Sequence, residues 1–438
     1  MMLPKGWKSI ALSELQTKTP SVDPRRYPTE MFDLFSVPSY TSDAPECVTG
    51  DKIGSVKQEV QSNDILLCKI VPHIRRAWSV PQRTQRRQIA SGEWIVFRSD
   101  YINSQYLRNF LISDGFHEQF MHTVSGVGGS LMRARPSEAV KISFPLPPLA
   151  EQRRIVAKLD SLTARIARAR AELERVPVLI ERYKKNLLKR AFAGELTNKW
   201  RLMNGVSEIE MTPLSDVCTS ITDGDHQAPP RAKHGVPFIT ISAMNNGEID
   251  LSKATRFVPS SYLDALKDSR KAKTGDVLFS VTGSIGIPAV VKHECPFVFQ
   301  RHIAILKPDT KRVSGLFLKL MLQSPDVQVQ CAAVATGTAQ LTVPLNRLRN
   351  FLIPLPTIAE QIEVIRLVES TFKRLERMQE DYVDADHLLS KLESSLLAKA
   401  FRGELVPQDP NDEPASVLLD RIRAERAADT KPGRKRRA

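Results

Sequence analysis

Basic side chains gather in segments of the chain that contain no aspartate or glutamate. Residues 65–92 and 226–247 are free of acid, and so is the short loop 282–286. Arg and Lys attract phosphate, and Arg can also bind guanine bidentately in the major groove. The candidate DNA-contacting residues are the cationic and polar side chains Lys69, His73, Arg75, Arg76, Arg83, Arg86, Arg87, His226, Arg231, Lys233, His234, Thr282, Ser284 and Arg301. A solvated basic loop remains the alternative for each single residue.

No motif in the chain predicts catalysis. A GxxxxGK[ST] phosphate loop is absent, and so is the Asn/Asp-Pro-Pro-Phe/Tyr tetrapeptide with which amino-methyltransferases hold a flipped adenine. The glycines of 126–129 have no strand before them and no helix after them. The His and Cys of 293–295 are too isolated for a zinc set, which favours an ordinary buried histidine. Residues 223–226 (Asp-Gly-Asp-His) indicate a turn or a polar DNA-facing loop. We therefore expect no catalytic residue and no metal site.

Composition agrees with a nucleic-acid ligand. The chain has 438 residues, a hydrophobic content of 42% and a net charge of +14, with a pI of about 9.6. This length predicts two or three domains with real cores, and the charge favours polyanions. Five scattered cysteines without a CxxC argue against a disulfide framework. No apolar run approaches the ~20 residues that cross a bilayer, so we expect a cytoplasmic protein without a membrane partner.

The elements that must position these residues are two long heptad helices. Apolar residues alternate at steps of four and three, which is typical of a coiled-coil seam. The first copy comprises Ile155, Leu159, Leu162, Ile166, Ala169, Leu173, Val176, Ile180, Tyr183 and Leu187. Adding 209 gives the second copy: Val364, Val368, Thr371, Leu375, Met378, Tyr382, Ala385, Leu389, Leu392 and Leu396. Seams of this kind usually mediate oligomerisation, but two equal copies in one chain favour an intramolecular antiparallel pair.

The repeat extends to the ends of both helices with the same offset of 209. Pro145, Leu146, Pro147, Ala150, Glu151 and Gln152 match Pro354, Leu355, Pro356, Ala359, Glu360 and Gln361. At the far end Leu187, Leu188, Ala191, Phe192, Gly194, Glu195 and Leu196 match Leu396, Leu397, Ala400, Phe401, Gly403, Glu404 and Leu405. The helices therefore have equal length, while the globules before them differ by loop insertions. A length kept in two copies indicates a spacer and a pseudo-twofold protein, which suits a two-part DNA target.

One proline distinguishes the two copies. Pro177 lies inside the first heptad pattern, where Asp386 stands in the second. Since the seam keeps its phase across Pro177, we expect a kink rather than a stop. Residues 359–402 contain no Gly or Pro and predict a rod of roughly 65 Å.

The predicted fold class is α+β: two mixed α/β globules and two long helices that form an intramolecular antiparallel coiled coil. The expected boundaries are 1–148 for the first globule, 149–199 for the first helix, 207–356 for the second globule, 357–406 for the second helix and 407–438 for the tail. In the first globule, 64–68 and 94–97 predict strands and 101–119 predicts a helix. In the tail, 415–428 predicts a short amphipathic helix, followed by a basic run at 431–437.

The doubled motif resembles the specificity subunit of type I restriction–modification systems. Each globule precedes Pro-Leu-Pro-x-x-Ala-Glu-Gln and a long helix that ends in Ala-Phe-x-Gly-Glu-Leu, and the ending 403–415 is also similar to that family. The family's stretch before the first helix is similar to Gly-x-x-Gln-x-x-Leu. Residues 336–341 keep a glutamine at Gln340, whereas the first globule has Ser130 there. The resemblance thus adds Gln340, but no equivalent in the first globule, to the DNA-contacting residues.

The resemblance implies the fold, the partners and the cofactors. Each globule would be a target recognition domain that reads one half of a split sequence in double-stranded DNA, and the coiled coil would fix the gap between the halves. Two methyltransferase subunits would dock on the helices, and restriction subunits would join later. S-adenosylmethionine, ATP and Mg²⁺ would bind to those partners and none of them to this chain. The expected attachment sites are the helix entrances and exits, with Pro145, Pro147, Glu151, Gln152, Phe192, Pro354, Pro356, Glu360, Gln361 and Phe401.

Two other functions remain open from the sequence. The chain could be a self-sufficient DNA-modifying enzyme with recognition domains fused to it, although it lacks the motifs. It could also be a coiled-coil scaffold that does not bind DNA and whose charge is incidental.

Overall fold

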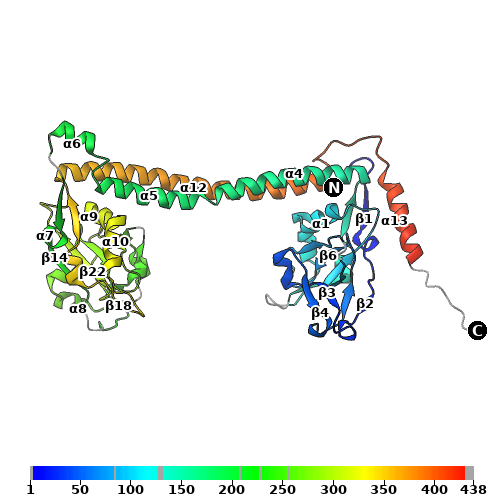
Figure 1. Cartoon of the computed structure of the whole chain (residues 1–438), viewed down its shortest axis with the longest axis horizontal. Helices are drawn as coiled ribbons and strands as arrows, with labels where there is room; N and C mark the ends of the chain where they lie inside the picture. The colour runs from blue at the N-terminus through cyan, green and yellow to red at the C-terminus, as the bar shows by residue number, and fades with distance from the viewer. Residues whose placement is uncertain are drawn as a thin grey trace, which may run out of the picture. The chain divides into compact units, whose positions relative to one another are not determined.

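The apolar runs of the sequence form short strands, and the two heptad stretches form the longest helices (Figure 1). The computed structural model describes residues 3–82, 85–126, 132–206, 209–225, 229–245, 247–254 and 256–429. The expectations for Arg83, His226, Ser130, residues 127–129 and the basic run 431–437 lie outside these residues. The chain forms two compact units: unit 1 comprises Met1–Leu173 and Asp384–Ala438, and unit 2 comprises Glu174–Val383.

Unit 1 contains two main sheets. A five-stranded sheet has the order β2-β5-β8-β3-β4, a three-stranded sheet has the order β7-β6-β9, and β1 pairs with β12 and β10 with β11. The strands are β1 (Lys8–Ala11), β2 (Ser21–Val22), β3 (Met31–Phe35), β4 (Glu46–Thr49), β5 (Lys57–Glu59), β6 (Ile65–Cys68), β7 (Ala77–Ser79), β8 (Arg87–Ala90), β9 (Trp94–Phe97), β10 (Val124–Ser125), β11 (Arg133–Ala134) and β12 (Ser143–Leu146). The helices are α1 (Ser104–Ile112), α2 (Asp114–Met121), α3 (Pro136–Ala139), α4 (Leu149–Leu173) and α13 (Ala415–Asp429), with the last part of α12 (Ile358–Arg402).

Unit 2 repeats part of this plan. A four-stranded sheet has the order β14-β22-β19-β20, a three-stranded sheet has the order β18-β15-β21, and β13 pairs with β23 and β16 with β17. The strands are β13 (Glu210–Pro213), β14 (Cys218–Asp223), β15 (Val236–Ile239), β16 (Met244–Asn245), β17 (Glu248–Ile249), β18 (Arg256–Val258), β19 (Val277–Ser280), β20 (Pro288–Val290), β21 (Val298–Phe299), β22 (Ile303–Pro308) and β23 (Leu352–Leu355). The helices are α5 (Val176–Phe192), α6 (Asn198–Asn204), α7 (Leu214–Val217), α8 (Ser260–Ala265), α9 (Gly315–Leu322), α10 (Pro325–Val334) and α11 (Leu345–Arg349), with the first part of α12.

The two units share one frame. The antiparallel set β7-β6-β9 of unit 1 corresponds to β20-β19-β22 of unit 2, and β1–β12 corresponds to β13–β23. The helix predicted over 101–119 is two helices, because Ser113 ends α1 and caps α2 by accepting from the Phe116 N–H. In unit 2, Ser324 caps α10 in the same way through the Val327 N–H. The five-stranded sheet of unit 1 has no counterpart of the same order among the described residues of unit 2.

Each unit contains an antiparallel pair of helix segments, as the heptads predict. In unit 1, Arg170 lies 3.4 Å from Asp386 and 3.6 Å from Glu393, while Ile155 near the start of α4 shares a core with Phe401 near the end of α12. In unit 2, Phe192 near the end of α5 shares a core with Val364 near the start of α12. In both units the far end of one helix therefore meets the beginning of the other.

The disturbance expected at Pro177 is a short interruption between α4 and α5. Glu174 and Arg175 form a turn, although the backbone of Arg175 keeps right-handed helical angles (φ −79°, ψ −21°). Pro177 stands in the first turn of α5, where its missing N–H leaves no helical hydrogen bond unmade. Asp386, at the equivalent position of the second copy, lies within the uninterrupted 45-residue helix α12.

A buried glutamine ties each long helix to its globule. The Gln152 side chain donates to the Pro147 carbonyl (3.0 Å) and accepts from the backbone N–H of Asn103 (2.9 Å), the residue that caps α1. Gln361 makes the same two bonds in unit 2, to the Pro356 carbonyl (3.0 Å) and from the N–H of Ser314 (3.0 Å), which caps α9. Both side chains are fully buried.

In each unit the glutamate next to this glutamine accepts a further buried hydrogen bond from outside its helix. The Trp7 indole donates to Glu151 (3.0 Å), and the Thr197 hydroxyl donates to Glu360 (2.5 Å). Arg201 also lies 3.5 Å from Glu360. Burial raises the pKa of Glu151.

The tail returns to the first globule of unit 1. Its predicted helix is α13, whose Leu418 and Ile422 are buried in the core of that unit. Arg154 of α4 binds Asp412 with both guanidinium nitrogens (3.2 and 2.7 Å), and the Ala415 N–H donates to the Gly6 carbonyl (3.1 Å). The tail therefore packs in the same hydrophobic core as Trp7 near the start of the chain.

A positive backbone angle recurs at two equivalent pairs of positions. Before the central strand, Asn63 (φ +70°) corresponds to Gly275 (φ +92°). After that strand, Val71 (φ +48°) corresponds to Gly283 (φ +85°). Asn and Gly adopt this conformation readily, whereas a β-branched residue does so only under strain. Val71 is thus strained at the start of a loop whose course both units share.

Replacing either buried glutamine by leucine is expected to lower the free energy of unfolding by about 1–3 kcal/mol, because the N–H of the capping residue loses its acceptor. The two losses should add, since the sites lie in different units. Urea unfolding of Gln152→Leu, Gln361→Leu and the double variant measures them. Lys158→Leu, an exposed change on α4, is the control and should stay within about 0.5 kcal/mol of wild type. Losses no larger than the control's would show that these bonds do not anchor the helices.

Val71→Asn is expected to raise the free energy of unfolding by about 1 kcal/mol, because asparagine tolerates the left-handed conformation. The reciprocal change, Gly283→Val, should lower it by about 2 kcal/mol. Both are measured by urea unfolding. A destabilised Val71→Asn variant would contradict the assignment of strain to this residue.

Candidate nucleic-acid interface

The equivalent loops after β6 and β19 are each held by the same pair of main-chain bonds. In unit 1, the Val71 N–H donates to the Met132 carbonyl (3.0 Å) and the Ala134 N–H to the Lys69 carbonyl (2.7 Å). In unit 2, the Gly283 N–H donates to the Leu341 carbonyl (2.9 Å) and the Val343 N–H to the Val281 carbonyl (2.8 Å). We call these the unit 1 clasp (residues 69–75 with 132–134) and the unit 2 clasp (281–286 with 341–343). Each clasp fixes a loop beside the segment that precedes the last strand of its globule.

The unit 2 clasp gathers four of the predicted DNA-contacting residues. Thr282 and Ser284 lie in the loop itself, and the Thr282 hydroxyl accepts from Thr342 (3.3 Å). Arg301 adjoins His302, whose carbonyl accepts from the N–H groups of the loop's first two residues (2.9 and 3.3 Å). The Gln340 amide nitrogen lies 3.4 Å from the position a Cβ would take on Gly283. Residues from three separate segments of the sequence therefore form one polar surface.

Arg301, Ser284 and Gln340 are exposed on this surface. Among the described residues, Arg301 makes no ion pair, so its charge is available to a phosphate or a base. Thr342 and His302 also belong to this surface, and no sequence pattern pointed to them. They are identified by their hydrogen bonds to the loop that begins at Val281.

The other predicted residues of unit 2 lie elsewhere. Arg231, Lys233 and His234 are exposed on a loop that is attached to β18 through the Ala232 N–H and the Phe257 carbonyl (2.9 Å). Within the part of the chain that the structure describes, no hydrogen bond joins this loop to the unit 2 clasp.

The aspartates of 223–225 are held within unit 2. Arg270 lies 3.6 Å from Asp223 and 3.5 Å from Asp225, and the Tyr262 hydroxyl donates to Asp225 (3.0 Å). Burial, with this hydrogen bond, raises the pKa of Tyr262 to about 12. No cluster of three metal-ligating side chains occurs among the residues outside the gaps named above.

Most of the predicted cations of unit 1 are paired with acids of the same unit. Lys69 bonds to the Gly92 carbonyl (2.5 Å) and lies 4.0 Å from Glu93, and Arg75 pairs with Asp114. Residues 65–92 contain no acid, but the fold brings acids from outside this segment to its side chains. Lys69 and Arg75 are therefore engaged by groups of unit 1 itself.

Arg86 and Arg87 are paired in the same way. Arg86 donates to Asp33 (2.6 Å), a buried carboxylate of β3. Arg87 lies 3.5 Å from Glu30 and 3.7 Å from Glu59, and it stacks over the Tyr27 ring.

The remaining residues of the first basic segment differ in exposure. His73 is exposed in the unit 1 clasp, whereas Arg76 is half-buried. Trp78 is a core residue against Phe35, with ring centroids 4.8 Å apart, and is not available to stack on a base.

Arg133 also belongs to the unit 1 clasp. Its side chain is 55% exposed and pairs with Glu93 (3.0 Å). The sequence analysis missed Arg133 because it lies outside the acid-free segment.

The residues predicted to attach partners are mostly internal. Glu151, Gln152, Glu360 and Gln361 are buried and bonded within their own units, and Phe192 and Phe401 belong to the two cores. Pro147 and Pro356 are buried, and Pro145 and Pro354 are half-buried. Because most of these side chains are buried, they mainly join helix to globule, and a partner needs further surface. Pro145 and Phe401 also line a cavity of unit 1.

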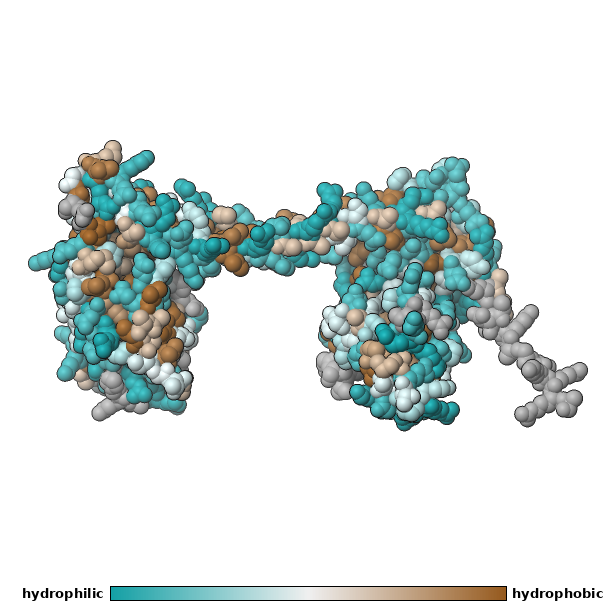
Figure 2. All heavy atoms as spheres, in the orientation of Figure 1, coloured by the Kyte–Doolittle hydropathy of each residue, from teal (hydrophilic) through white to brown (hydrophobic). Residues whose placement is uncertain are grey.

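The helices offer such a surface. A pair of helices encloses only part of each heptad seam, so Ile166, Ile180 and Leu375 are buried while Tyr183, Met378 and Leu392 are 54%, 51% and 47% exposed. Figure 2 shows brown hydrophobic residues among teal ones along the helices. Within the described ranges, none of the helices has the length and apolar character to span a membrane.

Comparison with known proteins agrees with this architecture. The model of the family "Type I restriction modification DNA specificity domain" matches residues 206–381. The EcoBI specificity subunit of Escherichia coli is 31% identical over 308 residues, which are 65% of this chain and 65% of that protein. The EcoKI specificity subunit of Escherichia coli K12 is 29% identical over 69% of this chain and 68% of its own length. The chain thus matches about two thirds of the length of these relatives.

A solved structure shares the fold over nearly the whole chain. It is described as the "Structural basis underlying complex assembly and conformational transition of the type I R-M system". The two chains superpose with a TM-score of 0.73 and 23% identity, covering 92% of this chain and all of the other. Together with the repeated helices and clasps, these matches make the chain similar to the specificity subunits of type I restriction–modification systems over about two thirds of its length.

Proposed function

We propose that the chain reads a two-part sequence in double-stranded DNA, with one half bound by each unit. The observation that carries this proposal is the repetition of the clasp. Both units fix a loop at the equivalent place of the shared strand frame, and the exposed side chains of Arg301 and Gln340 lie beside the unit 2 clasp. Arg supplies phosphate attraction, and Arg and Gln both suit bidentate contact with base edges.

The chain leaves the chemistry to partners in this proposal. Two methyltransferase subunits dock on the helices, where the half-exposed seam residues supply apolar area, and restriction subunits join the assembly. S-adenosylmethionine, ATP and Mg²⁺ bind to these partners, and base flipping takes place in the methyltransferase. The two specificity subunits of Escherichia coli that the chain resembles support such a role.

The long helices serve as a spacer between the two halves of the target in this proposal. The support is that both copies begin at equivalent residues, because α4 begins at Leu149 and α12 begins at Ile358, which is the position 209 residues later. The globules, in contrast, differ in their loops and in one sheet.

Arg301→Ala is expected to weaken binding of the target DNA and to reduce the slope of log K against log salt by about 1, because one phosphate or base contact is lost. Fluorescence anisotropy at four salt concentrations measures both quantities. Arg421→Ala is the matched control: Arg421 is an exposed arginine of α13 that pairs with the exposed Glu413 (2.8 Å), so its loss should leave the slope unchanged. Binding that does not depend on salt in the wild type would contradict the DNA-reading function and favour a scaffold.

Removing one heptad from each helix, residues 166–172 and 384–390, is expected to shorten the gap in the DNA target. Seven residues are roughly 10 Å of helix, which corresponds to about 3 base pairs of DNA. The two segments face each other through Arg170 and Asp386, so the seam keeps its phase. Sequencing of methylated adenines in cells that carry the variant with its methyltransferase measures the gap. An active variant with an unchanged gap would refute the spacer.

A further inference from the structure

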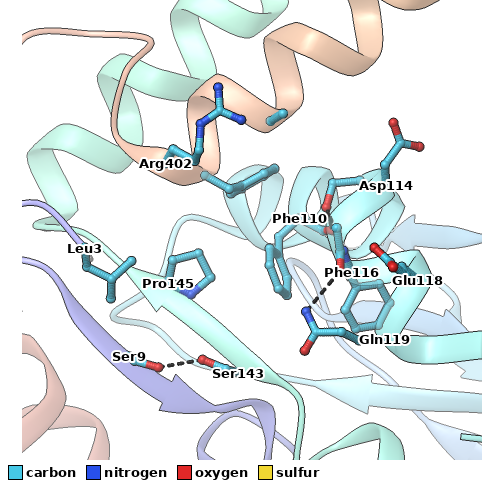
Figure 3. A pocket seen from close by; sticks show the side chains of 14 residues that line it. Leu3, Ser9, Phe110, Asp114, Phe116, Glu118, Gln119, Ser143, Pro145 and Arg402 are labelled. Atoms are coloured by element: carbon cyan, nitrogen blue, oxygen red, sulfur yellow. Dashed lines mark hydrogen bonds between the residues drawn. The ribbon is translucent and has the colours of Figure 1, made fainter. Parts of the chain in front are cut away.

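Unit 1 contains an open cavity of about 590 Å³ between β1–β12, α2 and the end of α12 (Figure 3). Three aromatic rings line it: Phe110 has its ring centroid 5.3 Å from that of Phe116 and 5.3 Å from that of Phe401. The volume lies within the range of roughly 300–1,000 Å³ that is usual for ligand sites. The cavity therefore offers an apolar space of the size that a bulky side chain requires.

A free strand edge borders this cavity at Ser143. β12 pairs with β1 along one edge only. Because the Leu12 N–H donates to the Ile142 carbonyl, alternation in an antiparallel pair directs the N–H and C=O of Ser143 to the opposite edge. Among the described residues, no hydrogen bond uses either group. The Ser143 hydroxyl is bonded to Ser9 (2.5 Å), as Figure 3 shows.

Unit 2 shows what kind of group satisfies this edge. The equivalent residue of β23 is Leu352, and the Gln330 carboxamide donates to its carbonyl (2.9 Å) and accepts from its N–H (2.9 Å). This two-bond contact is the one that the N–H and C=O of one residue of an added antiparallel strand make. The equivalent glutamine of unit 1, Gln119, instead donates to the Gly115 carbonyl of its own helix (3.0 Å, Figure 3). The edge that a carboxamide fills in unit 2 is thus left open in unit 1.

The charges at the rim of the cavity further restrict which kind of ligand can bind there. Asp114 and Glu118 both line the cavity. Asp114 pairs with Arg75, whereas Glu118 is exposed and has no ion pair with a described residue. Arg402, on the other side, is bound to Glu404 (2.7 Å). The free charge at the rim is therefore negative and suits a lysine or arginine.

We propose that an extended segment of the partner methyltransferase subunit adds to the free edge of β12 at Ser143. The N–H and C=O of one of its residues take the place that the Gln330 carboxamide occupies in unit 2. It places an apolar or aromatic side chain among the three phenylalanine rings, with a cationic residue beside Glu118. This inference rests on the proposed function, which supplies the partner. It also gives the two units unequal docking sites, because the described edge of unit 2 is already satisfied.

The test uses the full chain and the purified methyltransferase subunit from the same organism, with affinity measured by titration calorimetry. Gly115→Leu fills the cavity: a Cβ at Gly115 meets nothing within 4 Å, and leucine favours the helix more than glycine does. Ser143→Pro removes the outward N–H, which Pro145 also lacks two residues later, together with the hydroxyl that bonds to Ser9. We expect each change to weaken binding about tenfold, as loss of one anchoring contact implies. The controls Gly115→Ala and Ser143→Ala, which keep the cavity and the N–H, should bind as wild type does.

DNA binding by the chain alone and its thermal midpoint are measured for every variant. Weaker methyltransferase binding with both of these unchanged supports the inference. Equal affinity for wild type, Gly115→Leu and Ser143→Pro overturns it while the proposed function stands, and so does a loss that only accompanies unfolding. A wild-type chain that binds no methyltransferase subunit refutes the proposed partner and the inference together.

Discussion

A carboxamide that is cut off from water must have its donors and acceptor satisfied, and two such groups determine how this protein is built. Gln152 and Gln361 each bond to the proline-rich entrance of a long helix and to the residue that caps the first helix of the globule. Because an unpaired buried amide costs about 1–3 kcal/mol, the helix entrance and the globule hold each other in one arrangement. The adjacent glutamates, bonded to Trp7 and Thr197, reinforce it. Everything that a globule presents to a ligand is positioned relative to its helix through this junction.

Charge in this molecule is distributed differently from what its net value of +14 suggests. In unit 1, four cations of the acid-free segment are paired with carboxylates from outside it: Lys69, Arg75, Arg86 and Arg87. Exposed ion pairs contribute only about 0–1 kcal/mol each, so a DNA phosphate can compete for Arg75, whose partner Asp114 is itself exposed. The Arg86 pair differs, since its acid, Asp33, is buried, and breaking an ion pair at a buried carboxylate is costly. Exposure of the acid, more than the number of cations, thus decides which arginines a ligand can recruit.

The sequence was sufficient for the parts of the fold that depend on regular spacing. The heptads, the offset of 209 and the proline entrances predicted both helices and their antiparallel pairing, and the resemblance they carried led to the family. The strands at 64–68 and 94–97 were also predicted. The sequence did not show which distant residues would become neighbours. Examples are Glu59 beside Arg87, Glu93 beside Lys69, and Gln340 beside Gly283. Ser113 divides the helix that we expected over 101–119. Nothing in the sequence distinguished it from an ordinary helix residue, and only its hydrogen bond to the Phe116 N–H shows that it caps α2.

The return of α13 to the first globule has a consequence for how the protein is made. Unit 2 is one contiguous stretch, Glu174–Val383, whereas unit 1 joins residues from both ends of the chain. On the ribosome, unit 2 can therefore finish folding while the first globule still lacks the end of α12 and the buried Leu418 and Ile422. During that interval the nascent globule exposes the surface that these residues later cover. At high expression levels, the same surface can accept residues 384–429 of a neighbouring molecule, so domain-swapped dimers are the misassembly to which this topology is prone.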